Sequence, residues 1–104
     1  MVVATGPGFG TKPRPCVVLQ SDHYAVLPTV ILLPITTDLS EPPSSLRTRL
    51  DPGEANGLRR PSEVMADIPI TTRTQNVHQH VGRVSDSEMA RIERALLLVL
   101  GFGE

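Results

Sequence analysis

The sequence predicts a small, mainly β protein that carries one α-helix at its carboxyl end. Short runs of β-forming apolar residues are separated by turns, and the chain has ten prolines, eight glycines and only three aromatic residues. Such a composition is typical of a turn-rich β protein. Near the end of the chain, apolar residues instead recur at helical intervals. The 104 residues suit one core, so residues 1–104 are expected to form a single domain.

The composition limits the cellular compartment and the mode of nucleic-acid binding that are expected for the protein. The one cysteine, Cys16, lies in an apolar run and is interpreted as a small core side chain in a reducing cytoplasm, with a reactive thiol as the alternative. The longest apolar runs, residues 30–33 and 95–100, are far shorter than the roughly 20 residues that span a bilayer, so a soluble, cytoplasmic protein without a membrane segment is expected. The net charge of −1 means that RNA binding would depend on a local arginine cluster.

The first predicted strand is residues 1–5, which begins without lead-in residues and is therefore short or has lost its start. Residues 6–10 form a glycine-rich loop. This loop lacks the Gly-Lys-Ser/Thr ending and the following helix of a phosphate-binding P-loop. The interpretation is a mobile lid.

An arginine between two prolines stands directly before the second predicted strand, residues 16–20. Pro13 and Pro15 exclude the helical conformation from the residues before them, so Lys12 and Arg14 are both extended. A stiff backbone therefore directs the Arg14 side chain, which suits two-pronged binding of a phosphate or carboxylate. A solvated arginine at a strand boundary is the alternative interpretation.

The third predicted strand, residues 29–35, is so uniformly apolar that both of its faces are expected to be buried. Residues 21–28 and 39–44 are interpreted as loops. The strand ends at Thr36, which the order of elements puts beside the strand that carries Arg14. We therefore expect these two polar side chains to lie near each other.

Residues 46–50 alternate between apolar and polar side chains, which predicts a strand with one solvent-exposed face. Arg47 and Arg49 share that face and form either a phosphate track or a solvated edge that discourages aggregation. Residues 51–57 form a turn with Asn-Gly at its end.

Residues 63–68 alternate again, and Pro69 marks a sheet edge or bulge before residues 70–72. The alternation puts Val64, Ala66 and Ile68 on one face and Glu63, Met65 and Asp67 on the other. Asp67 has two structural interpretations: it lies on a solvent-exposed face of the strand, or it pairs with Arg73. A functional role is the alternative.

Two helices are predicted after these strands. Thr74 could cap a short helix through Val81, in which His78 and His80 would point to different sides, so no metal site is expected. Ser85 and Glu88 have the spacing of a capping box, and apolar residues recur at helical intervals until Gly101. Three further leucines (Leu97, Leu98 and Leu100) widen the apolar surface of this second helix, and a homodimer would cover it.

Several segments together resemble the MazF/PemK family of toxin endoribonucleases, in order and over nearly the whole chain. They are Lys12 to Pro15 before an apolar strand, Gln20-Ser21-Asp22, residues 29–36, residues 56–67, Val81-Gly82-Arg83-Val84-Ser85 and the terminal helix. The resemblance implies a small SH3-like β-barrel with a C-terminal helix, of the CcdB/PemK type. It also implies a homodimer that cuts single-stranded RNA and is neutralised by an antitoxin.

The resemblance also implies a set of site residues. The family's conserved arginine falls on Arg14, its threonine or serine at a strand end falls on Thr36, and an aspartate that acts in some members falls on Asp67. These three are the candidate catalytic residues. The candidate RNA-binding residues are Lys12, Ser21, Arg60 and Ser62.

Three positions depart from the family's pattern. The Gly-Asp usually found ahead of the first strand is missing, Met65 stands where some members carry a second catalytic arginine, and Pro69 replaces a residue that can usually donate in the sheet. A mechanism that needs the second arginine therefore does not transfer to this chain.

The chemistry expected from these residues needs no metal or cofactor, because RNA carries its own nucleophile, the 2'-hydroxyl. Arg14 would stabilise charge on the phosphate, Thr36 would bind the phosphate or orient the hydroxyl, and Asp67 would act as a base or read a base edge. The alternative is a non-catalytic protein of the same fold that binds a protein target, as gyrase poisons do, or only its antitoxin. A nucleic-acid binding module without catalysis is the third possibility.

Overall fold

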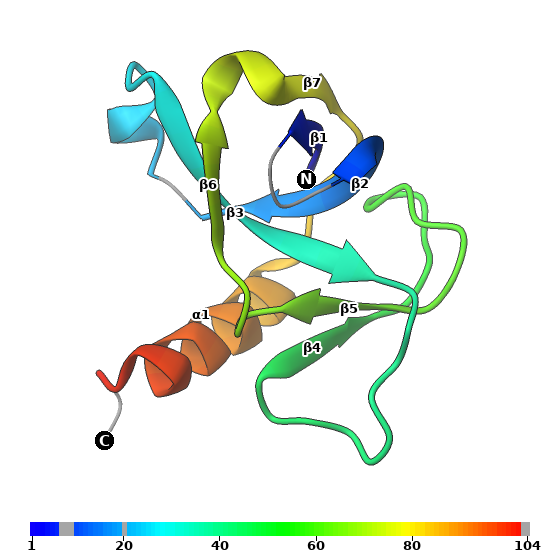
Figure 1. Cartoon of the computed structure of the whole chain (residues 1–104). Coiled ribbons are helices and arrows are strands. Elements are labelled where there is room, and N and C mark those ends of the chain that lie inside the picture. Colours follow the sequence, from blue (N-terminus) through cyan, green and yellow to red (C-terminus); the bar gives the residue numbers. More distant parts are fainter. Residues whose placement is uncertain (7–9, 20, 103–104) are drawn as a thin grey trace.

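The computed structural model describes residues 1–6, 10–19 and 21–102. Within them the chain forms β1 (Val2–Gly6), β2 (Gly10–Val18), β3 (Thr29–Thr36), β4 (Arg47–Leu50), β5 (Ser62–Met65), β6 (Ile70–Arg73), β7 (Val77–His80) and the helix α1 (Asp86–Leu100). Two short 3-10 turns, η1 (Asp22–Tyr24) and η2 (Thr74–Asn76), precede β3 and β7. The expectation of a mainly β protein with a C-terminal helix is confirmed (Figure 1).

The strands form one curved antiparallel sheet with β3 at its centre. The order of the strands in the sheet is β4-β5-β3-β2-β1-β7. β6 is not part of this order, and it pairs with β3. β2 pairs with Leu32 to Pro34 of β3, whereas β6 pairs with the first half of β3 and β5 with its last two residues. No pairing between described residues joins β4 to β7, so the sheet is not closed into a barrel.

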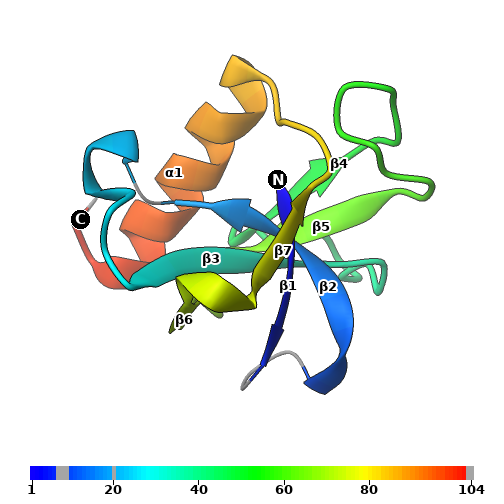
Figure 2. The same ribbon diagram turned by 90° about the horizontal axis from the view of Figure 1, so that it is seen from above.

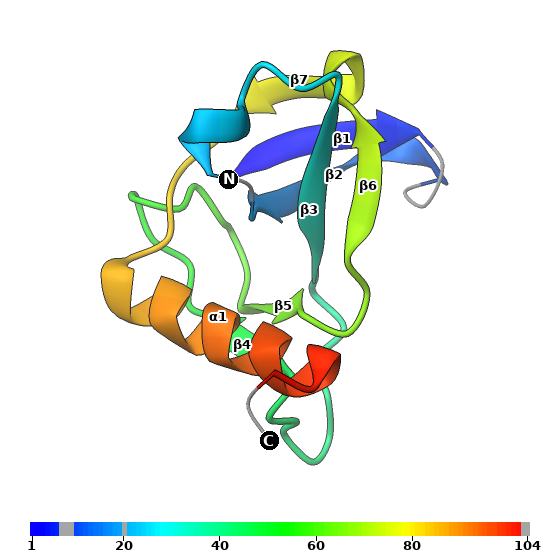
Figure 3. The same ribbon diagram turned by 90° about the vertical axis from the view of Figure 1, so that its left-hand side faces the viewer.

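Both faces of the central strands are buried, in two separate apolar clusters. The first cluster packs against α1 and includes Val17 of β2 and Leu33 and Ile35 of β3. The second cluster includes Cys16 of β2 and Leu32 of β3. Partly buried side chains from strands that include β6 and β7 pack against this second cluster. Figure 3 shows α1 in front of β4 and beside β5, with β1, β2 and β7 gathered toward the other end of β3. The prediction that β3 is buried on both faces therefore holds for its second half. It is wrong for Thr29 and Ile31, which are exposed.

The C-terminal helix begins and ends where its sequence signals predict. The Ser85 hydroxyl accepts a hydrogen bond from the Glu88 amide at 3.1 Å, and the Glu88 carboxylate accepts one from the Ser85 amide at 2.8 Å. This reciprocal pair is a capping box. Gly101 ends the helix in the left-handed conformation, with φ of 82°. In the described residues, no helix is long and apolar enough to cross a membrane.

The second strand is longer than predicted. β2 begins at Gly10 and not at Cys16, so Arg14 and its flanking prolines lie inside the strand. Pairing with β1 includes Arg14, opposite Ala4, whereas pairing with β3 starts only at Cys16. The proline stretch thus has a strand neighbour on one side, which is the position where a sheet tolerates prolines. Residues 7–9, the tip of the predicted lid, lie outside the described residues, as does Gln20.

The alternation predicted over residues 63–68 stops early. β5 ends at Met65, and the Ile68 amide donates to the Met65 carbonyl at 3.3 Å, which turns the chain before Pro69. Ile68 is consequently exposed instead of buried. Glu63, expected on a wet face, is 2% exposed because the segment after β3 covers it.

The helix predicted from Thr74 to Val81 is also wrong. Only η2 is helical there, and the chain continues as β7 along the free edge of β1, with His80 opposite Val2 (Figure 2). Pairing with β1 thus decides the conformation of this segment over its local propensity. His78 and His80 therefore lie on a strand and not on a helix, and the pairing with β1 shifts register at His78.

Candidate functional site

A pocket of about 270 Å³ lies where three strands and one loop meet, and four of the predicted site residues line it. β2 contributes Arg14, β3 contributes Thr36, and β5 contributes Ser62. The strand ends of Figure 1 show how the chain brings them together, since β3 ends on the same side as the loop between β4 and β5. The complete lining is Arg14, Pro15, Ile35, Thr36, Thr37, Leu58, Arg59, Arg60 and Ser62.

Three arginines give this pocket its electrostatic character. Arg14, Arg59 and Arg60 are all exposed, and none of them forms an ion pair within the described part of the chain. A guanidinium offers five donors and stays charged. Three unpaired guanidiniums around one pocket repel one another, so the pocket is suited to an anion that relieves this repulsion, such as a phosphate. This local cluster exists although the chain's net charge is −1.

Two hydroxyl side chains line the pocket, and they differ in whether the O–H is free to donate a hydrogen bond to a ligand. Thr36 Oγ1 accepts a hydrogen bond from the Asp38 amide at 3.0 Å, so its own O–H is left to donate to a ligand. Ser62 is 1% exposed, and its hydroxyl already donates to the Arg60 carbonyl at 2.9 Å. Ser62 therefore fixes the backbone of Arg60, whereas Thr36 has a free donor beside the pocket.

A rigid turn before β5 positions Arg59 and Arg60. The buried Asn56 accepts hydrogen bonds from the Gly53 and Leu58 amides at 3.1 and 2.9 Å and donates to the Asp51 carbonyl at 2.8 Å. The predicted turn over residues 51–57 is thus present.

The turn also packs closely on the chain after β7. A Cβ on Gly82 would lie 2.5 Å from the Asn56 backbone, so Gly82 has no room for a larger residue. The Arg83 amide donates to the Ala55 carbonyl at 2.8 Å. These contacts hold the turn in place and so hold the two arginines that follow it.

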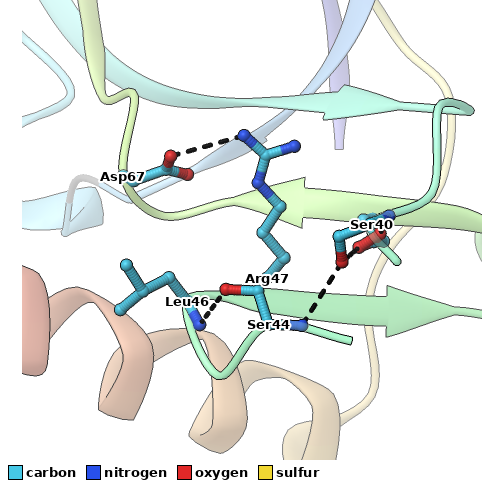
Figure 4. Close-up of polar contacts among 6 residues, drawn as sticks. Ser40, Ser44, Leu46, Arg47 and Asp67 are labelled. Atoms are coloured by element: carbon cyan, nitrogen blue, oxygen red, sulfur yellow. Dashed lines mark hydrogen bonds and ion pairs between the residues drawn. The ribbon is translucent and has the colours of Figure 1, made fainter. Parts of the chain in front are cut away.

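Three of the candidate site residues do not line this pocket. Lys12 is exposed on β2, two residues before Arg14. Ser21 borders a separate, mainly apolar pocket of about 170 Å³, and its hydroxyl accepts the His23 amide at 3.2 Å. Asp67 follows β5 and forms an ion pair with Arg47, with 3.3 Å between Asp67 Oδ2 and Arg47 Nη2 (Figure 4). The partner of Asp67 is therefore Arg47, and the predicted pairing with Arg73 is wrong.

The candidate set drawn from the sequence omitted five residues that line the pocket: Pro15, Ile35, Thr37, Leu58 and Arg59. Arg59 could have been predicted from the sequence, because it stands beside Arg60 in the same short motif. Thr37 could have been predicted for the same reason, because it directly follows Thr36. Leu58 lies in the same motif, but an apolar residue after a turn is ordinarily part of the core.

Neither the cysteine thiol nor the potential metal-binding side chains of the described residues indicate a second reactive site. Cys16 is fully buried, and burial raises the pKa of its thiol to about 12, so its interpretation as a core side chain is supported. Among the described residues, no group of three His, Cys, Asp or Glu side chains could hold a metal ion.

The fold and the pocket together define a small β protein that presents an arginine-lined pocket beside a free hydroxyl donor. The sequence profile described as "PemK-like, MazF-like toxin of type II toxin-antitoxin system" matches residues 1–100. The chain therefore belongs to the family of PemK-like and MazF-like toxins of type II toxin-antitoxin systems.

Individual proteins are similar to this chain in sequence or in fold. A protein of Mycolicibacterium smegmatis named "Probable endoribonuclease MazF" is 37% identical over 90 residues, which cover 86% of this chain and 82% of that protein. The solved Mycobacterium tuberculosis toxin MazF-mt6 shares the fold, with a TM-score of 0.82 and 23% identity over 96% of this chain and 94% of that one. A mycobacterial endoribonuclease solved with its cognate antitoxin has a TM-score of 0.76 and 19% identity, over 96% and 90% of the two chains.

Proposed function

We propose that this toxin is a metal-independent endoribonuclease that cleaves single-stranded RNA, in particular messenger RNA, at short sequence motifs. The observation that carries the proposal is the shared pocket of Arg14 and Thr36, which come from different strands. The named activity of the 37% identical relative supports the same reaction. Because messenger RNA is the substrate, the cytoplasm is the proposed place of action.

The reaction proposed is a transesterification within the RNA strand. The 2'-oxygen attacks the neighbouring phosphorus, the bond from phosphorus to the 5'-oxygen breaks, and the 2'-proton is removed while the leaving oxygen gains one. The products are a 2',3'-cyclic phosphate and a 5'-hydroxyl. The charge that develops on the phosphate oxygens needs donors that are already in position, and this is the role proposed for the pocket.

Arg14 and Thr36 have distinct proposed roles in this step. Arg14 holds the nonbridging phosphate oxygens and stabilises their charge, and its pKa is too high for easy proton transfer. Thr36 donates its free O–H to the phosphate or orients the 2'-hydroxyl. Arg60 and its neighbour Arg59 hold the flanking phosphate, while Ser62 supports Arg60 through the hydrogen bond between them.

Asp67, Lys12 and Ser21 have proposed roles outside the pocket. Asp67 is the proposed base or reader of a base edge, and its carboxylate would first have to leave Arg47. Because that pair also gives Asp67 a structural role, Asp67→Asn is expected to lower cleavage less than Arg14→Ala does. Lys12 and Ser21 would contact the RNA strand on either side of the cleaved phosphate.

The test is cleavage of a mixed-sequence RNA by the purified protein in EDTA, with the cyclic phosphate identified by mass spectrometry. Arg14→Ala is expected to lower the rate by at least about 100-fold, the typical effect of losing one donor to a developing oxyanion. Arg73→Ala is the matched control, since Arg73 is exposed on β6 and does not line the pocket.

Three outcomes would contradict the proposal or part of it. Cleavage that persists in Arg14→Ala would overturn the role of Arg14. Absence of cleavage on every RNA would overturn the activity, and salt-dependent RNA binding without products would then indicate a binding module. Growth arrest with intact messenger RNA would indicate a toxin that poisons a protein target.

Two partners belong to the proposal. The first is a cognate antitoxin, supported by the family and by the structural relative that was solved with one. The second is another copy of this chain. Leu97, Leu98 and Leu100 are 46%, 43% and 53% exposed on α1, and a homodimer would cover them.

A further inference from the structure

Glu63 is the one charged side chain among the described residues that is almost completely buried, and the proposed reaction does not use it. It is 2% exposed, in β5, directly after Ser62. A buried carboxylate is costly unless hydrogen bonds compensate for its lost hydration. Its partners therefore indicate what it stabilises.

Both carboxylate oxygens of Glu63 accept hydrogen bonds from one residue of the segment that joins β3 to β4. The Ser40 amide donates to Oε1, and the Ser40 hydroxyl donates to Oε2 at 2.9 Å. The Ser40 hydroxyl in turn accepts a hydrogen bond from the Ser44 amide at 3.3 Å (Figure 4). Glu63 thus holds Ser40 against the sheet, and Ser40 in turn binds the Ser44 amide of the same connecting segment.

This segment begins at the pocket. Thr36 and Thr37 line the pocket, and the Asp38 amide holds the Thr36 hydroxyl oxygen at 3.0 Å. Asp38 is only two residues before Ser40, and Thr36 lies directly opposite Glu63 in the pairing of β3 with β5. A short chain of contacts therefore runs from the Glu63 carboxylate through Ser40 and Asp38 to the hydroxyl of Thr36.

We infer that Glu63 is a positioning residue for Thr36. Through Ser40 it keeps the backbone after β3 in the conformation in which the Asp38 amide occupies the acceptor side of the Thr36 hydroxyl. The Thr36 proton is then directed to the ligand in the pocket. This inference rests on the proposed function for its kinetic readout, but the hydrogen bonds themselves can be tested without any activity.

The kinetic test is a double-mutant cycle on RNA cleavage by the full chain, with Glu63→Gln, Ser40→Ala and Thr36→Val. Ser40→Ala is expected to lower kcat by about threefold to tenfold with little change in KM, the size of effect that one hydrogen bond produces. Glu63→Gln, which keeps shape and one acceptor oxygen, is expected to have a smaller effect. In the Thr36→Val background neither substitution should lower kcat further, because Glu63 acts through that hydroxyl.

Two controls separate positioning from general destabilisation. Ser45→Ala changes an exposed serine of the same segment that has no side-chain hydrogen bond in the described part of the chain, and it should leave kcat unchanged. Thr36→Ser retains the hydroxyl and should preserve the response to Ser40→Ala. If Ser40→Ala lowers kcat equally in the unaltered chain and in the Thr36→Val background, the inference is overturned and the role of Glu63 is structural alone.

A measurement without activity distinguishes failure of the inference from failure of the proposed function. Amide hydrogen exchange should be slow at Ser40 in the unaltered chain, and it should become faster at Asp38 and Ser40 in Ser40→Ala but not in Ser45→Ala. Unchanged exchange would overturn the positioning role. If exchange responds as expected while no variant and no unaltered protein cleaves RNA, the contact chain stands and the proposed endoribonuclease activity is wrong.

Discussion

At the level of single residues, exposed charged side chains and buried, hydrogen-bonded polar side chains lie next to one another at the pocket. Arg14, Arg59 and Arg60 are exposed at one pocket, whereas Ser62 and Glu63, the next two residues after Pro61, are buried and hydrogen-bonded. An exposed guanidinium keeps its donors for a ligand, and a buried polar group must form its hydrogen bonds inside the protein. Burial therefore distinguishes two kinds of polar residue that lie side by side in the sequence.

The buried thiol of Cys16 should lower the stability of the fold at high pH. Its pKa is raised by burial to about 12 in the folded chain, from a reference of 9.0. Above pH 9 the unfolded chain loses the thiol proton while the folded chain retains it, so the free energy of unfolding should fall by about 1.4 kcal/mol per pH unit as the pH rises from 9 toward 12.

Chemical denaturation at several pH values, compared with Cys16→Ala, measures this contribution. The comparison with Cys16→Ala removes the effect of other groups that titrate in the same range. The difference in stability between the two proteins should shrink as the pH rises above 9. A difference that is independent of pH would show that the thiol ionises equally well in the folded chain.

At the scale of elements, the helix α1 and the strand β7 show when local sequence decides conformation. The start and stop signals of α1 lie within the helix and its flanks, and the structure has both. Residues 77–80 instead pair with β1, which lies more than 70 residues earlier in the chain. A capping residue acts on its own helix, whereas a strand needs a partner that local sequence does not reveal.

The capping box of α1 should contribute measurably to stability. Ser85→Ala removes the acceptor of the Glu88 amide and is expected to lower the free energy of unfolding by about 1 kcal/mol. Glu88→Gln keeps a side-chain acceptor for the Ser85 amide and should cost less. Thermal or urea denaturation followed by circular dichroism compares the two. Equal stability of Ser85→Ala and the unaltered chain would mean that packing of Ile92 and Ala95 alone determines the helix.

At the scale of the whole molecule, the exposed leucines of α1 remain without cover in a single chain. Leu98 borders two grooves on the helix, one of them shared with β4. Burial of leucine side chains contributes about 25 cal/mol per Å² of apolar surface. A surface of this kind favours association, which is why a homodimer is part of the proposed function.

Sedimentation of the purified chain should therefore give twice the mass of 11.3 kDa. Leu98→Lys should shift the protein toward the mass of one chain, because a positive charge would be buried beside Arg91 and Arg94, which line the same grooves. Val26→Lys is the matched control, since Val26 is 91% exposed in the segment between β2 and β3 and should not affect the mass. A single-chain mass at high protein concentration would contradict the homodimer.

Features whose signals are local could be predicted from the amino-acid sequence alone. The capping box and Gly101 delimit α1, the apolar run of β3 indicates a buried strand, and Asn-Gly ends the turn before Arg59. The order of short motifs also identified the toxin family, which the profile match confirms. Each of these features depends on residues within a few positions of one another.

The remaining features depend on contacts between residues that are distant in the sequence, so they are apparent only in the folded chain. Pairing with β1 extends β2 back to Gly10 and puts Arg14 inside a strand, and the segment after β3 folds over Glu63 and buries a residue predicted to be exposed. The partner of Asp67 is Arg47, 20 residues away, instead of the nearer Arg73. The meeting of Arg14, Thr36 and Arg60 at one pocket likewise results from the order of the strands in the sheet.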